Sequence, residues 1–486
     1  MSELTILQKG IKKTLFFEGE ALVDDLLKEA GAVAPHPCGG HGKCGKCKIS
    51  ISGAVLPPNE AEIKAKTRLS CQARVFGDAT VILPDGDESA QIETETGSIP
   101  SFTPNMGEGY GAAVDIGTTT IAVKVFDLSD GSLLGTSSAL NPQASVAADV
   151  MGRIEAAING DLPLLSSLVT DTLKELIIKA NPDKKIPDTL VVTGNTTMLY
   201  LLMGLSPKSL SSAPFKADNL FGIDTRLLAS NCYLPPCMNA FVGADITCAV
   251  LASGMCEKNE ISLLCDIGTN GEIALFKEGR LYVTSTAAGP AFEGAGISCG
   301  CSSVDGAIDK VTADNSEIKI HTINEKSAVG LCGSGLIDAV AAGLKLGLID
   351  ETGAMDDDLI LSENVSLQPK DIRAVQLAKA AIAAGIKTLL QISDTKESEI
   401  ERLYIAGGFG SHLNIQSAAD IGLIPNELTD RTTILGNAAL SGAIRVLLCP
   451  EERQKLEGIA ELSEHINLGG NPKFNENYIE EMLFPE

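Results

Sequence analysis

The pattern of apolar and polar residues divides the chain into two organised regions, with a stretch between them that shows no period. In the first region, alternating apolar residues predict short strands, and leucines at helical spacing over 20–30 predict a helix that Gly31 ends. Lys9-Gly10 between the first two strands is typical of a hairpin turn. The predicted strands lie at 4–8, 12–17, 48–52 and 79–83. This region is therefore predicted to be a small α+β domain.

The second region contains apolar strands that end in the same four residues, Asp-Ile-Gly-Thr. The runs 111–120 and 262–272 both contain this motif, at Asp115 and Asp266, and both continue into a second strand and a turn. The two copies stand 151 residues apart, and their matching strand–turn–strand context indicates an internal duplication. We therefore predict an α/β body made of two related halves.

Between the two regions, residues 84–109 are rich in Pro, Gly, Ser, Thr and acidic residues and contain no Lys or Arg. This composition is typical of a solvated linker, and a coil of this length spans roughly 25–30 Å on average. We therefore expect the first domain to be tethered and mobile. The predicted boundaries are 1–86 for the first domain, 87–109 for the acidic flexible linker, and 110–260 and 261–486 for the two halves of the body.

Charge separates the same two regions. Residues 1–86 hold 11 of the 38 Lys and Arg and 10 of the 63 Asp and Glu, so they carry a net charge of +1, and the remainder carries −26, for a chain total of −25. An acidic body without a basic stripe argues against a nucleic-acid partner. Because the chain shows neither a signal-like leader nor an apolar run of about 18 residues, we expect no membrane span and a cytoplasmic location.

Three cysteines crowd one glycine-rich loop, Cys38-Gly-Gly-His-Gly-Lys-Cys44-Gly-Lys-Cys47, and a fourth follows at Cys71. Glycine lets the backbone curl around an inorganic cluster, and cysteine thiolates are the usual ligands of iron–sulfur clusters. A structural zinc site is the alternative, since C-x2-C is a common zinc half-site, but zinc normally takes two separated pairs of ligands. The spacing therefore favours a [2Fe–2S] cluster.

The repeated Asp-Ile-Gly-Thr turn indicates phosphate binding. Glycine lets backbone amides approach phosphate oxygens, threonine adds hydroxyl donors, and Asp115 and Asp266 stand where a hydrated Mg²⁺ would be held. A third element, over 403–411, is a strand ending in glycines against which an adenosine can lie. Together the three elements resemble the nucleotide site of the actin, sugar kinase and Hsp70 (ASKHA) superfamily.

Nearly the whole chain resembles one family. The segment 68–73 around the last cysteine is similar to that of a β-grasp ferredoxin, and the body carries VDIGTTT, NPQ, GNTTM, GADIT, DIGTNGE, AGPAFEG, CGSGLID and AGGFG in this order. This set resembles the reductive activators of corrinoid proteins, which are ATP-dependent iron–sulfur proteins. The resemblance implies a β-grasp [2Fe–2S] ferredoxin domain, a linker and a duplicated actin-like ATPase fold.

In that family, one electron passes from the cluster to a corrinoid stranded as Co(II) and restores the Co(I) needed for methyl transfer. The resemblance therefore implies a Co(II) corrinoid protein as acceptor and an upstream low-potential electron donor, and it is compatible with a homodimer. The implied cofactors are a [2Fe–2S] cluster, ATP and Mg²⁺. The implied cluster ligands are Cys38, Cys44, Cys47 and Cys71, and the implied catalytic residues are Asp115, Asp266 and Glu272. The implied nucleotide-binding residues are Gly117, Thr118, Thr119, Gly268, Thr269, Asn270, Gly407, Gly408 and Gly410.

Other functions stay open at this point. An ATP-driven electron donor of the kind that activates acyl-CoA dehydratases holds its cluster between subunits with cysteines of the nucleotide domain, which the separate N-terminal motif does not match. A small-molecule kinase with a redox-sensing module and a nucleotide-gated redox sensor are further alternatives. Outside the motifs, Cys299, Cys301 and Cys332 are expected to be buried or turn thiols. Lys379 is expected to lie on the solvated face of a long helix over 372–390.

The cysteine motif predicts that the purified protein is brown and contains iron and sulfide in equal amounts. Cys44→Ser should destroy or strongly perturb the visible absorption of the cluster, because one of its four thiolate ligands is lost. Cys301→Ser is the control and should leave the spectrum unchanged. An absorption spectrum that is indifferent to Cys44→Ser would refute the assignment.

Overall fold

The computed structural model describes residues 1–8, 11–30, 32, 34, 42, 47–83, 107–314, 317–408 and 412–485. The chain divides into two compact units, Met1–Ser89 with Pro142–Leu168 and Ala90–Asn141 with Val169–Glu486. The linker predicted at 87–109 lies outside the described residues except for its last three positions.

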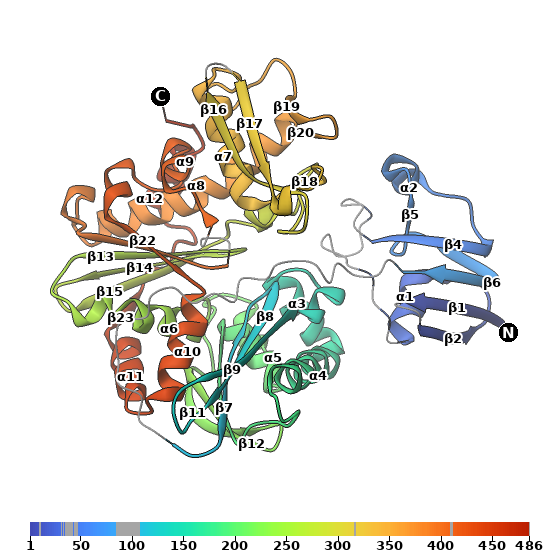
Figure 1. The fold of residues 1–486 in the computed structure, drawn as a ribbon, viewed down its shortest axis with the longest axis horizontal. Helices are drawn as coiled ribbons and strands as arrows, with labels where there is room; N and C mark the ends of the chain where they lie inside the picture. The colour runs from blue at the N-terminus through green and yellow to red at the C-terminus, as the bar shows by residue number, and fades with distance from the viewer. Residues whose placement is uncertain are drawn as a thin grey trace. The chain divides into compact units, whose positions relative to one another are not determined.

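The first unit contains a mixed sheet in the order β2-β1-β6-β4-β5 (Figure 1). Its first two strands form the predicted antiparallel hairpin, and β1 runs parallel to β6. A parallel central pair flanked by antiparallel neighbours is the arrangement of a β-grasp sheet. The strands are β1 (Ser2–Gln8), β2 (Ile11–Phe17), β3 (Ala21–Leu22), β4 (Lys48–Val55), β5 (Arg68–Leu69) and β6 (Arg74–Ile82).

One helix, α1 (Val23–Glu29), packs its apolar side against this sheet. It begins three residues later than predicted, because Ala21–Leu22 pairs with β6 as the short strand β3. Val23 and Leu27 are fully buried in one cluster with Leu4 of β1. A second helix, α2 (Glu60–Ala65), starts with a capping box between Asn59 and Glu62, which satisfies backbone amides of its first turn.

The same unit includes a helical segment that follows the Asn-Pro-Gln motif. Arg153 is fully buried there, and its guanidinium donates to the carbonyl of Ala147 at 3.0 Å and to Gln143 Oε1 at 3.3 Å. Gln143 in turn donates to the carbonyl of Leu165 at 2.9 Å, so the motif fixes the segment from inside. The segment comprises η1 (Pro142–Ser145), α3 (Val150–Ala156), η2 (Ala157–Asp161) and the start of α4 (Leu162–Ala180).

The second unit contains two six-stranded sheets that share the same order over five strands (Figure 1). In each sheet, a meander of three antiparallel strands is joined by a parallel strand beside its first member, which confirms the predicted duplication. The first sheet, in spatial order, is β11 (Phe221–Leu227), β12 (Ser230–Pro236), β10 (Thr189–Gly194), β7 (Tyr110–Ile116), β8 (Thr120–Asp127) and β9 (Leu133–Leu140). The second is β22 (Thr432–Gly436), β21 (Arg402–Ala406), β13 (Ser262–Ile267), β14 (Gly271–Lys277), β15 (Arg280–Thr286) and β23 (Ser463–His465).

Two helices, α6 (Ala244–Ser253) and α10 (Ala438–Leu448), lie between the two sheets (Figure 1). Their buried side chains share one apolar cluster with residues of both sheets, such as Ala113 and Leu264. The helices approach so closely that a Cβ added at Gly442 would stand 2.1 Å from the carbonyl oxygen of Cys248. This crossing therefore joins the two halves of the body.

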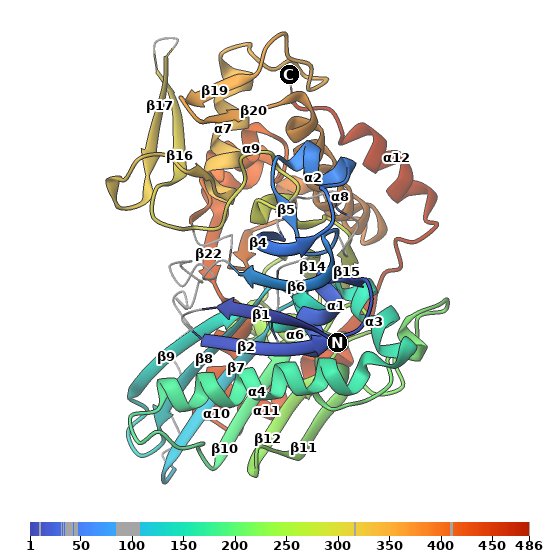
Figure 2. The same ribbon diagram turned by 90° about the vertical axis from the view of Figure 1, so that its right-hand side faces the viewer.

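The remaining elements also belong to the second unit. The C-terminal half of α4 lies against the first sheet, where Ser137 Oγ donates to the carbonyl of Leu176 at 2.7 Å. The second half carries a three-stranded insertion whose hairpin β16–β17 projects from the body (Figure 2). These elements are α5 (Thr196–Leu202), β16 (Ala307–Asp314), β17 (Glu317–Thr322), β18 (Gly330–Leu331), α7 (Gly333–Lys345), β19 (Leu359–Ser362), β20 (Val365–Leu367), α8 (Pro369–Ile392), α9 (Ile415–Asp420), α11 (Glu452–Leu462) and α12 (Pro472–Glu480).

The long helix α8 corrects the expectation for Lys379. Its side chain is 1% exposed and not solvated, because the C-terminal segment covers this face of the helix. Lys379 Nζ donates to the carbonyl of Leu483 and lies 5.5 Å from the centre of the Phe484 ring, and burial lowers its pKa to about 8. Among the described helices, α8 is long and apolar enough to cross a membrane, but 72% of its apolar window is buried, as in the core helix of a globular body.

The crossing of α6 and α10 predicts a pair of opposite stability effects. Gly442→Ala should lower the stability of the body by about 1–3 kcal/mol, because the added Cβ forces the two helix backbones apart. Gly458→Ala in α11 is the matched control, since no atom lies within 4 Å of its Cβ position, and it should stabilise by about 0.5–1 kcal/mol. Thermal unfolding measures both. Equal unfolding midpoints for Gly442→Ala and the wild type would contradict the close crossing.

Candidate functional site

Two of the four predicted cluster ligands lie within the described residues, and they converge. Cys47 and Cys71 are buried with their sulfur atoms 3.2 Å apart, well beyond the length of a disulfide bond. Gln72 Nε2 donates to Cys71 Sγ at 3.6 Å. Burial raises the pKa of the Cys47 thiol to about 12, so a metal must replace its proton if it is to act as a thiolate. This donor chemistry fits an iron–sulfur cluster. Cys38 and Cys44 lie outside the described residues.

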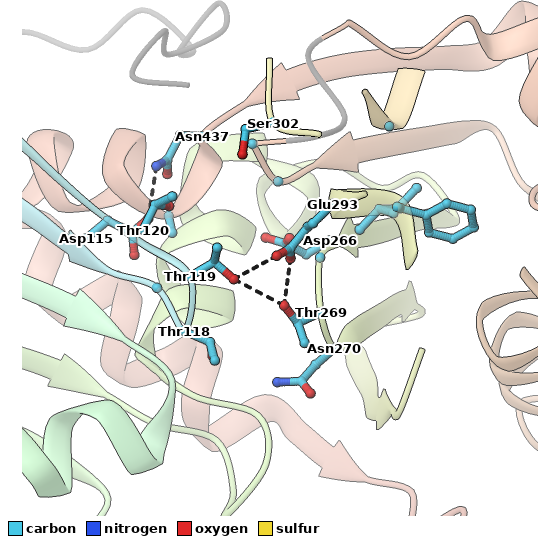
Figure 3. A pocket seen from close by; sticks show the side chains of 18 of the residues that line it. Asp115, Thr118, Thr119, Thr120, Asp266, Thr269, Asn270, Glu293, Ser302 and Asn437 are labelled. Carbon is cyan, nitrogen blue, oxygen red and sulfur yellow. Dashed lines mark hydrogen bonds between the residues drawn. The ribbon is translucent and has the colours of Figure 1, made fainter. Parts of the chain in front are cut away.

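The second unit contains a cavity of about 270 Å³ between its two halves, and Figure 3 shows its lining. Both Asp-Ile-Gly-Thr hairpins face this cavity, and so do the turn that follows β21 and the first residues of α7. The structure therefore brings together elements that lie far apart in the sequence. Gly410, predicted for the same site, lies outside the described residues.

The first hairpin connects β7 to β8 and is held by two asparagines. Asn141 donates from Nδ2 to the carbonyl of Gly117 at 2.8 Å, and its backbone amide donates to the carbonyl of Thr119. Asn195, the N-cap of α5, donates to Thr118 Oγ1 at 3.1 Å. A Cβ at Gly117 would stand 2.8 Å from the carbonyl oxygen of Thr120, so the tight turn requires glycine. These contacts fix the hairpin before any ligand arrives.

The second hairpin connects β13 to β14 and carries Gly268, Thr269 and Asn270 into the cavity. Gly268 is not crowded by the protein, since a Cβ there would meet only the carbonyl oxygen of Asn270 at 3.6 Å. Gly407, after β21, has a φ of 100° and approaches closely, because its Cβ would stand 2.7 Å from Asp266 Oδ1. Gly407 and the exposed Gly408 therefore leave an open backbone surface beside the second hairpin.

Four carboxyl groups line the same cavity. Asp115 and Asp266 are the next-to-last residues of β7 and β13. Glu272 lies opposite Asp266 on β14, and Asp245 stands in the first turn of α6. Asn437, the N-cap of α10, donates to Asp115 Oδ2 at 2.9 Å. Both central helices thus begin at the cavity and place a polar residue in it.

Burial and mutual repulsion raise the pKa values of these carboxyls. Burial raises the pKa of Asp115 to about 6, against the opposing effect of the Asn437 hydrogen bond. The pKa of Asp266 rises to about 7, through burial and then the charge of Asp115. That of Asp245 rises to about 8, through burial and then the charges of Asp115 and Asp266. Glu272 is raised well above its ordinary value by burial and by Asp245 and Asp266. A positive charge beside these carboxyls would favour their ionised forms.

A fifth carboxylate, Glu293, lies between the two hairpins. Thr119 Oγ1 donates to Glu293 Oε2 at 2.7 Å, and Thr269 Oγ1 donates to Glu293 Oε1 at 2.6 Å (Figure 3). The two threonine oxygens are 3.4 Å apart. One anionic group therefore contacts the hydroxyls of both hairpins.

Sequence reasoning noted the GNTTM, GADIT and AGPAFEG motifs, which contain Asn195, Asp245 and Glu293, but it did not name these residues or Asn437 as site residues. A signal for the two asparagines exists, because Gly194-Asn195 and Gly436-Asn437 both join a strand to a helix within the duplicated halves. Asp245 and Glu293 stand within the GADIT and AGPAFEG motifs, but no feature of these motifs indicates where their side chains point. Cys301 and Cys332 also line the cavity, although the sequence indicated only that they would be buried or turn thiols.

Comparison with known proteins identifies the family to which each domain of this chain is similar. Residues 7–76 match the 2Fe-2S iron–sulfur cluster binding domain, residues 110–258 the RACo middle region, and residues 260–486 the C-terminal ASKHA domain of RACo. The corrinoid activation enzyme RamQ of Eubacterium limosum is 36% identical over an alignment of 446 residues that covers 82% of this chain and 75% of that enzyme. The chain belongs to the RACo family of corrinoid activators.

Two further relatives support the assignment of this protein to the RACo family. A Co(II) methylated amine-specific corrinoid protein reductase of Methanosarcina barkeri is 26% identical over 77% of this chain and 77% of its own length. The solved structure of a reductive activator for corrinoid, iron–sulfur protein has 26% identity and a TM-score of 0.72, and covers 100% of this chain and 99% of that one. The match over 7–76 supports an iron–sulfur cluster in place of zinc, and the ASKHA match confirms the fold predicted for the body.

The carboxyl cluster predicts an unusual dependence of stability on pH. Between pH 3.8, the ordinary aspartate value, and about 8, the folded body retains protons that the unfolded chain has released, so its stability should fall as pH rises. Asp245→Asn cannot ionise and should flatten this slope, whereas Asp356→Asn, at an exposed position, should not. Denaturant unfolding of the ligand-free protein across this range measures the slope. Identical slopes for Asp245→Asn and the wild type would count against the buried cluster.

Proposed function

We propose that this protein is an ATP-dependent reductive activator of a corrinoid protein. It takes an electron from an upstream low-potential donor and reduces the inactive Co(II) form of a separate corrinoid protein to Co(I), which supports methyl transfer. The single observation that carries the proposal is the presence, on one chain of this family, of an iron–sulfur domain and of two phosphate-binding hairpins that face one cavity. The bound cluster would supply one-electron transfer.

We infer that the cavity takes ATP with Mg²⁺. Thr118, Thr119 and Thr269 provide hydroxyl groups for phosphate oxygens, and Gly407 and Gly408 provide backbone surface for the adenosine. Within the described residues, no three His, Cys, Asp or Glu side chains are placed to bind a metal ion by themselves. This agrees with Mg²⁺ held through water by Asp115 and Asp266, since Mg²⁺ usually keeps several waters.

ATP has a physical role in such a reaction because the electron moves uphill. A plant-type [2Fe–2S] centre lies near −400 mV. The resemblance to corrinoid activators implies that the Co(II)/Co(I) couple of the acceptor is more negative. Each further 59 mV costs about 1.4 kcal/mol for one electron. Closing the two halves of the body on a nucleotide can offset this cost if the closed form binds the acceptor more favourably than the open form.

We also propose a cytoplasmic location. None of the eleven cysteines among the described residues forms a disulfide, and the buried ones include Cys232, Cys248 and Cys265. Burial raises the pKa of Cys232 to about 12, which keeps this thiol protonated and unreactive at neutral pH. Thiols of this kind suit a reducing compartment.

The proposal predicts that the reduced protein converts a Co(II) corrinoid protein to its Co(I) form only when Mg–ATP is present. The visible absorption spectrum of the corrinoid measures this conversion. Asp115→Ala and Asp266→Ala should each slow this conversion by at least about 100-fold, because the Mg²⁺ that neutralises the phosphate charge is no longer held in place. The visible spectrum of the cluster should not change in either variant. Asp356→Ala, at an exposed position, is the control.

Two results would count against this function. Full activation without ATP would remove the nucleotide from the reaction. Full activation by both Asp115→Ala and Asp266→Ala, together with unchanged ATP affinity in calorimetry, would place the nucleotide elsewhere.

A further inference from the structure

Glu293 is the acidic residue of the cavity whose carboxylate contacts both hairpins. It closes η5 (Pro290–Glu293), a single turn between two glycines in left-handed conformations, Gly289 with φ 79° and Gly294 with φ 77°. The backbone amide of Gly289 donates to the carbonyl of Thr269 at 2.9 Å, so the turn is anchored to the second hairpin. Glu293 therefore reaches the first hairpin from a fixed position on the second half.

The Glu293 carboxylate accepts hydrogen bonds from the two threonine hydroxyls in the same way as two oxygens of a phosphoryl group would. A threonine hydroxyl has one proton to donate, so a hydroxyl that donates to Glu293 cannot donate at the same time to a phosphate oxygen. The hydroxyls of Thr119 and Thr269 are 3.4 Å apart, close enough for two oxygens of one anion to accept from both. The Glu293 carboxylate does this at 2.7 and 2.6 Å. It therefore uses the two hydroxyl donors that a phosphoryl group in this cavity would use.

We propose that Glu293 is a clasp between the two halves, which the terminal phosphoryl group of the nucleotide displaces. In the nucleotide-free protein the carboxylate ties Thr119 of the first hairpin to Thr269 of the second. When the phosphoryl group takes the two hydroxyls, the tie through Glu293 breaks, so the arrival of this group is coupled to a rearrangement between the halves. The inference rests on the proposed binding of ATP in this cavity and assigns Glu293 a positioning role in it.

The experiment measures the affinity of the full-length, cluster-loaded protein for a non-hydrolysable Mg–ATP analogue by calorimetry. Glu293→Gln removes the charge and leaves one acceptor oxygen, so it should tighten binding of the analogue about tenfold, as expected for the loss of a competing charge-assisted hydrogen bond. AMP lacks the terminal phosphoryl group, and its affinity should not change. Glu317→Gln, at an exposed position outside the cavity, is the matched control.

A double-mutant cycle separates the clasp from a general effect of charge. In a Thr119→Val/Thr269→Val background the clasp cannot form, so Glu293→Gln should give no further tightening. Equal tightening in both backgrounds would show that only charge matters. Weaker binding in Glu293→Gln would make Glu293 a ligand of the nucleotide or of its metal. Either result overturns the clasp and leaves the proposed function standing.

Amide hydrogen exchange tests the clasp without nucleotide. Glu293→Gln should speed exchange at 117–120 and 268–271 in the nucleotide-free protein, and Glu317→Gln should not. If the wild type binds neither the analogue nor AMP, the nucleotide function fails, and this measurement still decides whether the tie exists. Unchanged exchange in Glu293→Gln, with an intact cluster spectrum and unfolding midpoint, would overturn it.

Discussion

The close crossing of α6 and α10 is the constraint on which the rest of the body depends. The helices touch where Gly442 meets the backbone of Cys248, and they share their apolar cluster with both sheets. Each also begins at the cavity, α6 with Asp245 in its first turn and α10 with Asn437 as its N-cap. The contact that joins the two halves therefore also sets the distance between the groups that line their cavity. A shift of one helix along the other would therefore change the distance between the Asp245 carboxyl and the Asn437 amide.

The cavity combines two opposite electrostatic demands. Four carboxyls with raised pKa values favour a cation, whereas the hydroxyls and glycines of the hairpins favour an anion. The proposed Mg–ATP complex would satisfy both at once, because its cation would face the carboxyls and its phosphate oxygens would accept from the hydroxyls. In the proposed clasp, the Glu293 carboxylate accepts from the same hydroxyls until the phosphoryl group replaces it.

Much of this arrangement could be predicted because its signals are local. A strand, an Asp-Ile-Gly-Thr turn and a second strand follow one another directly, so the sequence alone predicts both hairpins and the duplication. The contacts of Asn437 with Asp115 and of Glu293 with Thr119 join residues 322 and 174 positions apart, and no local pattern contains them. Lys379 shows the same limit, because helical spacing cannot reveal that the segment around Leu483 covers that face. Only the assembled fold supplies this information.

The late position of α10 in the chain has a consequence for synthesis on the ribosome. The first half needs this helix to cover part of its core, yet α6 ends at Ser253 and α10 ends at Leu448. At about 5–20 residues per second, translation leaves this core incomplete for roughly 10–40 s. The ferredoxin sheet, whose strands all lie within the first 82 residues, can fold long before then. The nascent body therefore presents apolar surface to chaperones throughout an interval in which its electron-carrying domain is already able to receive iron and sulfide.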